Sequence, residues 1–243
     1  MTLQEQELAA DFARLTGEAA RDPLDTRTLL ATVAAGGSRL FGASGAMVQY
    51  APVGRAPVQA HGTDEALTLL AVDAVEWREG PGYDTRTTGC ALIDVDVTKR
   101  PVRTRWPRWV PRARALGLGR VTALPLRAEE GAGGTVGALV LLGAPGSSLD
   151  EGALVVVRTF AEAAGHTLSL QRELTESRVL AGQLEHALSS RVVVEQAKGL
   201  LAARHGITLD AAFDRLRRHA RSRQRKVADV AREITEGGDP TDQ

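Results

Sequence analysis

Residues 189–206 read SSRVVVEQAKGLLAARHG, and this stretch decides the architecture of the C-terminal part of the chain. Its apolar side chains recur at helical spacing and form one stripe: Val193, Ala197, Leu200 and Leu201. None of the 10 prolines falls between residues 146 and 239, and proline is excluded from helix interiors. We therefore predict one helix that runs from Ser148 to about Arg204 and is ended by Gly206.

Two shorter helices are expected after Gly206. Thr208 is a good N-cap for the first, because its hydroxyl can accept a hydrogen bond from a backbone N–H of the first turn. The apolar stripes consist of Leu209, Phe213, Leu216 and Ala220 in one helix and of Val227, Val230, Ala231 and Ile234 in the other. With the stripe above, they predict a three-helix bundle of about 50 residues. Such a small bundle is expected to depend on the long helix and on a partner chain for stability.

A second pattern precedes the bundle in the long helix. Small and apolar residues alternate at spacings of four and three: Leu170, Leu174, Ser177, Ala181, Leu184 and Leu188. This is the seam of a two-stranded coiled coil, weak in its middle, and it predicts a dimerising linker helix over residues 168–188. The alternative is a helix that packs on its own domain.

Charge is distributed unevenly although the whole chain is neutral. From Glu185 to Arg232 there are eleven Lys and Arg against five Asp and Glu. Between Arg215 and Lys226 seven residues are basic and none is acidic. Such a surface attracts phosphates, which predicts a nucleic-acid partner, and a solvated helix face is the alternative. Glu195 stands one turn before Lys198 and is expected to form at most a weak surface ion pair with it.

The same residues carry a family resemblance. Leu188-Ser-Ser-Arg191, Glu195-Gln-Ala-Lys-Gly-Leu-Leu201, Arg204-His-Gly206, Ala212-Phe213, Leu216-Arg217 and Val227-Ala-Asp-Val-Ala231 together resemble the ANTAR domain, which we place at residues 189–238. The resemblance implies a protein that binds RNA hairpins in nascent transcripts as a homodimer and favours the antiterminator over the terminator. Two residues depart from the family pattern: Ala202 replaces a common methionine, and Gln224 replaces a common asparagine.

Carried over by position, the resemblance implies eight candidate RNA contacts: Arg191, Gln196, Lys198, Gly199, Arg204, Arg217, Arg218 and Lys226. The cations would hold backbone phosphates, Gln196 would read a base edge, and Gly199 would allow close backbone approach. Ala197, Phe213 and Leu216 are expected in the core. Phe213 is the only aromatic residue of this module, so a base-stacking platform is not expected.

The front of the chain has a different pattern, with short β-type segments between Gly/Pro turns. We expect strands at Ala46 to Tyr50, Ala91 to Val97, Arg120 to Leu126 and Thr135 to Leu142, and a helix from Glu65 to Trp77. These predict an α+β fold with an antiparallel sheet domain at residues 21–167. Residues 1–20 are expected to form an N-terminal helix and residues 239–243 a disordered tail.

This front part resembles the GAF domains that precede ANTAR in actinobacterial regulators. The resembling segments are Glu79-Gly-Pro-Gly-Tyr83, Leu92-Ile-Asp-Val95, Thr104-Arg-Trp-Pro-Arg-Trp109, Ala115-Leu-Gly117, Ala123-Leu-Pro-Leu126 and Val136-Gly-Ala-Leu139. The resemblance implies a six-stranded antiparallel sheet that holds a small-molecule ligand or a dimerisation signal, with neither the ligand nor its site named. Many relatives have a cysteine where this chain has Gly82, so thiol chemistry is not expected there.

Other candidate groups in this domain have ordinary explanations. The single cysteine, Cys90, is expected to be an inert small side chain. His61 and His166 are expected to be ordinary histidines and not haem ligands, since nothing pairs them in the sequence. Trp106 and Trp109 would either line a pocket or fix a loop against the sheet. We expect no metal and no cofactor.

The remaining inferences concern function class and location. The chain lacks a Gly-x-Ser-x-Gly motif, a phosphate-binding loop and a His-Glu-x-x-His motif, so an enzyme is not expected. The N-terminus is acidic and no apolar segment approaches the roughly 20 residues of a membrane span, which predicts a cytoplasmic protein with no membrane partner. Two alternative functions stay open: a DNA-binding transcriptional regulator, and a ligand-sensing dimerisation protein without nucleic acid.

Overall fold

The computed structural model describes residues 10, 13–14, 17, 26–51, 57–128 and 134–237. The chain forms two compact units, Met1–Leu174 and Thr175–Gln243, and each is considered by itself. The expected helix over residues 1–20 lies almost wholly outside the described residues, and the tail 239–243 lies wholly outside them.

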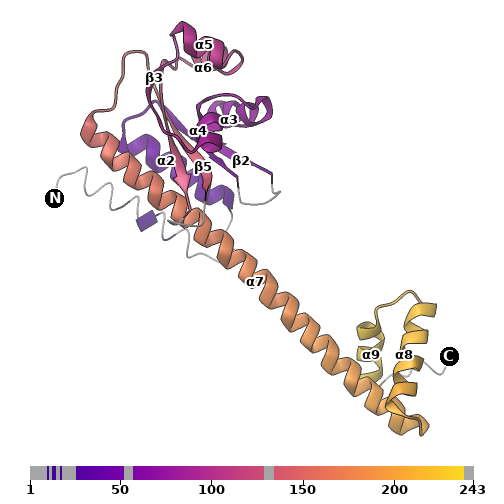
Figure 1. Ribbon diagram of the computed structural model, residues 1–243. Coiled ribbons are helices and arrows are strands. Elements are labelled where there is room, and N and C mark those ends of the chain that lie inside the picture. Colours follow the sequence, from indigo (N-terminus) through magenta and orange to yellow (C-terminus); the bar gives the residue numbers. More distant parts are fainter. Residues whose placement is uncertain are drawn as a thin grey trace. The chain divides into compact units, whose positions relative to one another are not determined.

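The first unit is built on an antiparallel sheet (Figure 1). Its strands are β1 (Gly45–Tyr50), β2 (Gln59–Gly62), β3 (Leu92–Asp96), β4 (Arg120–Arg127) and β5 (Thr135–Gly143), in the order β2-β1-β5-β4-β3. The predicted α+β class and antiparallel sheet are confirmed. The described residues contain five strands, not the six that the resemblance implied. β2 was missed because Gln-Ala-His-Gly at the sheet edge carries no apolar alternation.

Helices cover both faces of this sheet. On one face α2 (Thr26–Leu40) and the first part of α7 (Glu151–His205) share an apolar core with the sheet, to which Leu30, Phe160 and Leu168 belong. The other face is covered by α3 (Glu65–Trp77) and α6 (Trp109–Ala115), with Leu70 and Trp109 in its core. Because β5 is buried on both faces, Val136 to Leu142 read as an almost continuous apolar run, and β1 is equally buried although it contains Gln49.

The helix predicted from Glu65 to Trp77 is confirmed at both ends, and Asp64 caps it by accepting a hydrogen bond of 2.8 Å from the Leu67 N–H. Three short helices were not expected: α4 (Pro81–Thr88), α5 (Arg100–Arg105) and α6. They contain prolines and arginines and little apolar periodicity, so their helical form follows from packing against the sheet.

The long helix α7 begins at Glu151, three residues after the expected Ser148. Asp150 supplies the cap, since its Oδ1 accepts a hydrogen bond of 2.7 Å from the Ala153 N–H. Beyond Leu168 the helix leaves the sheet core, and every residue from Glu173 to Ser189 is exposed in the single chain. The part of the helix that carries most of the heptad seam therefore lies outside the sheet core, with its seam leucines Leu174, Leu184 and Leu188 exposed.

Candidate nucleic-acid interface

The second unit is a three-helix bundle made by the end of α7, α8 (Leu209–Ser222) and α9 (Val227–Thr235). Its buried core consists of Ala197, Leu201, Ala212, Leu216, Ala220, Val230, Ala231 and Ile234. The predicted bundle is thus confirmed, but two expected core residues are wrong. Leu200 is 42% exposed, because its neighbour Leu201 takes the inward position, and Leu209 is 52% exposed in the first turn of α8.

In the bundle, α7 and α8 both end with a residue in the left-handed conformation and a backbone hydrogen bond back to the helix. Gly206 has a φ of 63°, and the Ile207 N–H donates back to the Ala202 carbonyl at 3.2 Å, which closes α7 with a left-handed cap. At the end of α8 the Arg225 N–H donates to the Ala220 carbonyl at 2.8 Å, and Gln224 takes the left-handed position with a φ of 52°. The sequence departure at Gln224 therefore falls on a position that favours Gly or Asn.

Thr208 is the N-cap of α8 as predicted, and its hydroxyl accepts a hydrogen bond of 3.2 Å from the Ala211 N–H. The first turn of α8 carries Asp210, whereas its basic residues begin at Arg215, midway along the helix. The helix therefore presents acid at its N-terminal end and cations toward its C-terminal end.

Some cations of the basic segment from Arg215 to Lys226 contact other side chains, and others have no ion pair among the described residues. Arg225 is bound to Glu233 at 2.7 Å, and Arg217 lies over the Phe213 ring at 4.6 Å. Four exposed cations have no ion pair within the described part of the chain, and we call them the free cations: Arg218, Arg221, Arg223 and Lys226. Unpaired cations this close together repel one another, so an anionic partner would stabilise the surface.

Phe213 organises a second group of charges at the contact of α7 with α8. The Lys198 Nζ lies 5.4 Å from the centre of its ring, and Arg217 stacks on the same ring. Lys198 is held further by Glu195, whose two carboxylate oxygens lie 3.0 and 2.9 Å from the Nζ. The Lys198 side chain is only 15% exposed, so it is a positioned cation and not a mobile one.

The ion pair expected between Glu195 and Lys198 is therefore present, and Phe213 is partly buried. Phe213 was predicted to be a core residue, but it also orients two cations. The i, i+4 spacing of Phe213 and Arg217 on one helix was the available signal.

The other candidate contacts are distributed along the surface. Arg191, Gln196 and Gly199 are exposed on α7, Arg204 is exposed in its last turn, and Lys226 precedes α9. The structure thus brings Lys198 and Arg217 together through Phe213. A Cβ placed on Gly199 would meet nothing within 4 Å, so no contact within the chain requires glycine there.

In the sheet domain, Trp106 and Trp109 are buried to 1% and 0% exposure and pack edge to face with ring centres 5.5 Å apart. The Trp106 indole N–H donates to Asp84 at 2.9 Å. Glu79 Oε1 accepts hydrogen bonds of 2.6 Å from the Arg108 and Trp109 backbone N–H groups. The tryptophans therefore fix α5 and α6 against the sheet and occupy the space beneath them.

Gly82 lies in the same contact of α4 with the sheet. A Cβ at this position would approach the Gln49 carboxamide to 3.0 Å, so a cysteine would displace Gln49. The glycine that replaces the relatives' cysteine at position 82 therefore leaves room for the Gln49 carboxamide. Nearby, burial lowers the pKa of Arg86.

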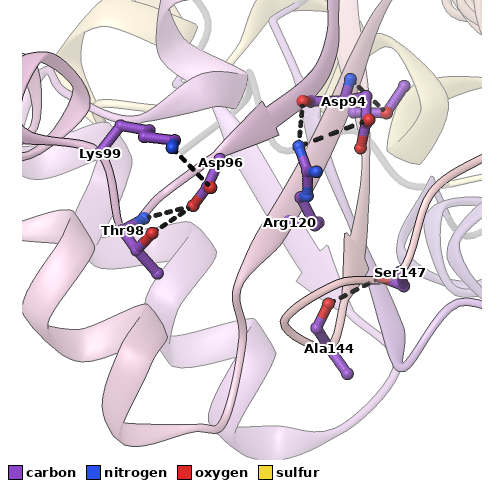
Figure 2. A network of polar contacts seen from close by, with 8 residues as sticks. Asp94, Asp96, Thr98, Lys99, Arg120, Ala144 and Ser147 are labelled. Carbon is purple, nitrogen blue, oxygen red and sulfur yellow. Dashed lines mark hydrogen bonds and ion pairs between the residues drawn. The ribbon is translucent and has the colours of Figure 1, made fainter.

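The outer edge of this sheet is held by a polar network (Figure 2). Arg120 donates to the Asp94 carbonyl at 2.9 Å and lies 3.4 Å from its carboxylate. Asp94 has a φ of 49° at an irregularity in β3, and Arg120 fixes that conformation. Asp96 accepts from the Thr98 hydroxyl at 2.6 Å, and this hydrogen bonding lowers the pKa of Asp96. Asp94, Asp96 and Arg120 all have hydrogen-bond or ion-pair partners within this network, which indicates a structural role.

The remaining candidates are isolated. Cys90 is exposed, and its thiol donates only to the Thr88 carbonyl at 3.7 Å. His166 is exposed and His61 is half-buried. Among the described residues no helix is both long enough and apolar enough to span a bilayer.

The second unit resembles one known domain family. Residues 182–234 match the ANTAR domain family, and we refer to the bundle that they include as the ANTAR-type module. No curated protein matches the chain.

The comparison with solved structures returns GAF domains. The GAF domain of an Acinetobacter phosphoenolpyruvate-protein phosphotransferase aligns at 10% identity over 72% of this chain and 99% of that chain, with a TM-score of 0.49. The corresponding domain from Coxiella burnetii aligns at 13% identity over 72% and 99%, with a TM-score of 0.49. GAF-B of DevS from Mycobacterium smegmatis aligns at 18% identity over 63% and 99%, with a TM-score of 0.44.

Proposed function

We propose that the chain is a cytoplasmic, RNA-binding transcription antiterminator that binds hairpins in nascent mRNA as a homodimer and is controlled by a signal sensed in a GAF-type sheet domain. The observation that carries the proposal is the position of the free cations on a bundle that matches the ANTAR family. The protein acts as a regulator and not as an enzyme.

The interface supports RNA as the partner through two kinds of cation. Lys198 and Arg217 are held on Phe213 and present fixed charges, whereas the exposed free cations can follow the phosphate backbone. Gln196 and Gly199 lie exposed on the same turn of α7, where Gln196 can meet a base edge and Gly199 leaves room for it.

The geometry supports RNA over the major groove of DNA. A recognition helix reads bases mainly with residues near its N-terminus. In α8 the first turn carries Asp210, and Asp214 follows one turn later; both carboxylates repel phosphates. The cations lie at the opposite end, where they suit the backbone of a hairpin.

Dimerisation is supported by the exposed heptad seam. Leu184 and Leu188 are 57% and 64% exposed, on a helix segment whose residues are all exposed from Glu173 to Ser189. A second copy of the helix would cover them. Because α7 joins the sheet core to the bundle without a break, ligand binding in the sheet domain can alter dimer pairing or release the bundle.

The test measures binding of the full chain to a labelled RNA hairpin and to duplex DNA of equal length over a range of salt. Arg218→Gln with Arg221→Gln is expected to lower hairpin affinity and to reduce the slope of log affinity against log salt by roughly 2, because about one counterion is released per phosphate contact. The control is Arg78→Gln with Arg108→Gln, which removes the same charge from the exposed surface of the sheet domain.

Three outcomes separate the candidate functions. Preference for the hairpin and a reduced slope only in the tail variant support the proposal. Equal affinity for duplex DNA supports a DNA-binding regulator. No salt-dependent binding to either nucleic acid supports a ligand-sensing dimerisation protein.

A further inference from the structure

A second basic surface lies on the sheet domain, far along the sequence from the ANTAR-type module. From Val97 to Ala128 the chain has nine Lys and Arg and no Asp or Glu. This segment includes α5, α6 and β4. Neither the bundle nor the heptad seam accounts for this concentration of charge.

Three of these cations form ion pairs with carboxylates of neighbouring elements. Arg105 is bound to Asp84 at 2.7 Å, and Arg112 is bound to Asp73 at 3.0 Å. Arg120 is bound to Asp94. These arginines fasten α5, α6 and β4 to neighbouring elements and are not available to a ligand.

Three other arginines face one hollow of about 720 Å³: Arg100, Arg103 and Arg114. Arg100 and Arg103 stand one turn apart on α5, and Arg114 comes from the last turn of α6. None of the three has an ion pair within the described part of the chain, and no acidic residue lines the hollow.

The nearest carboxylate along the chain is already bound. Asp96 accepts from Thr98 and lies 4.0 Å from the Lys99 Nζ, as Figure 2 shows. Three unpaired guanidinium groups around one hollow therefore repel one another with no counter-charge from the protein. Arginine donates in a planar fork that fits phosphate oxygens, so a multivalent phosphate is the kind of anion that matches this lining.

The rest of the lining restricts the ligand further. Pro107 and Pro111 are exposed and form an apolar wall beside the arginines. The Thr104 hydroxyl also lines the hollow and already donates to the Arg100 carbonyl at 3.2 Å. The volume is that of hollows which hold small organic ligands, about 300–1,000 Å³. The lining thus combines a phosphate-binding side with an apolar side.

We propose that this hollow binds a small molecule with two or three linked phosphates on an apolar group, of the nucleoside polyphosphate class, and that this molecule is an input to the sheet domain. The assignment rests on the sensing role proposed above. It does not depend on RNA binding by the bundle, since the arginines, the threonine and the prolines all belong to the sheet domain.

The experiment is calorimetric titration of the full chain with inorganic orthophosphate, inorganic triphosphate and guanosine triphosphate. We expect saturable binding of triphosphate, tighter binding of the nucleotide because its base covers Pro107 and Pro111, and much weaker binding of orthophosphate. Arg103→Gln with Arg114→Gln is expected to lower triphosphate affinity by at least about tenfold, since each arginine supplies charge-assisted hydrogen bonds.

The matched control is Arg218→Gln with Arg221→Gln, which removes two arginines from the ANTAR-type module. It is expected to keep triphosphate affinity and to lose hairpin affinity, whereas the Arg103 and Arg114 variant keeps hairpin affinity. Unchanged triphosphate binding in the Arg103 and Arg114 variant overturns the site, as does its loss in the control. If the Arg103 and Arg114 variant loses hairpin binding and the native chain binds no triphosphate, the hollow is an RNA contact and the proposal is wrong.

Discussion

Replacing the two most C-terminal leucines of the heptad seam tests the dimer most directly. The variant is Leu184→Gln with Leu188→Gln. Both leucines are more than half exposed in the single chain, at 57% and 64%. Glutamine keeps the helix, because it is a good helix former, but it does not bury well in a coiled-coil seam.

The expected effect follows from these exposures. Complete burial of a leucine contributes about 1.5–3 kcal/mol, so covering the exposed part of each side chain contributes about 1–2 kcal/mol. A dimer buries four such side chains, two from each protomer, which amounts to roughly 4–7 kcal/mol. At about 1.4 kcal/mol per factor of ten, the variant is expected to weaken dimerisation by about three orders of magnitude or more.

Sedimentation equilibrium of the full chain measures this change, and circular dichroism verifies that α7 is retained. The matched control is Val179→Gln. Val179 is 56% exposed on the same helix segment but lies off the seam. A dimer that survives both leucine substitutions refutes the coiled-coil assignment, and so does equal dissociation of the Val179 variant. Loss of hairpin affinity in the monomeric variant would further tie RNA binding to the dimer.

Three further predictions concern single residues. Gly199→Ala is expected to stabilise the chain by about 0.5–1 kcal/mol in urea unfolding, because alanine favours the helix, and yet to weaken hairpin binding by closing the open space beside α7. Gly182→Ala is its control, with the same open surroundings, and equal hairpin affinity in the two variants would contradict a contact at Gly199. Gln224→Asn is expected to raise stability by about 0.5 kcal/mol, since asparagine tolerates the left-handed conformation at the end of α8 better, and unchanged thermal unfolding would argue against that strain. Burial and the charge of Arg27 lower the pKa of His61 below its usual 6.5, so the unfolded chain takes up the proton first and stability falls as the pH drops through 6.5. His61→Gln is expected to remove this component of the decline, and an identical pH profile of unfolding would show that His61 does not contribute.

The strongly periodic elements could be predicted from the sequence. The helix from Glu65 to Trp77, the strands β1, β4 and β5 and the helices of the bundle all carry local signals that survive in the fold. β2 and the short helices α4, α5 and α6 have no such signals. Their conformations depend on contacts with residues far away in the sequence, such as the bond from Trp106 to Asp84.

The candidate RNA contacts were chosen by residue type and by resemblance, and these criteria do not show which charges are already paired. Arg217 and Arg225 look alike in the sequence. In the fold, Arg217 stacks on Phe213 and Arg225 is bound to Glu233, which leaves Arg221 and Arg223 as further free cations that the resemblance did not indicate.

The sequence by itself determined the α+β class, the long helix, the three-helix bundle and the basic character of the C-terminal segment, because periodicity and net charge are local properties of the chain. Only the tertiary structure decided which charges are free. An arginine becomes a structural ion pair or a binding group according to the carboxylate or ring that the fold places within a few ångströms of it. The same holds for the hollow around Arg100, Arg103 and Arg114: among the described residues, the fold places no carboxylate in its lining.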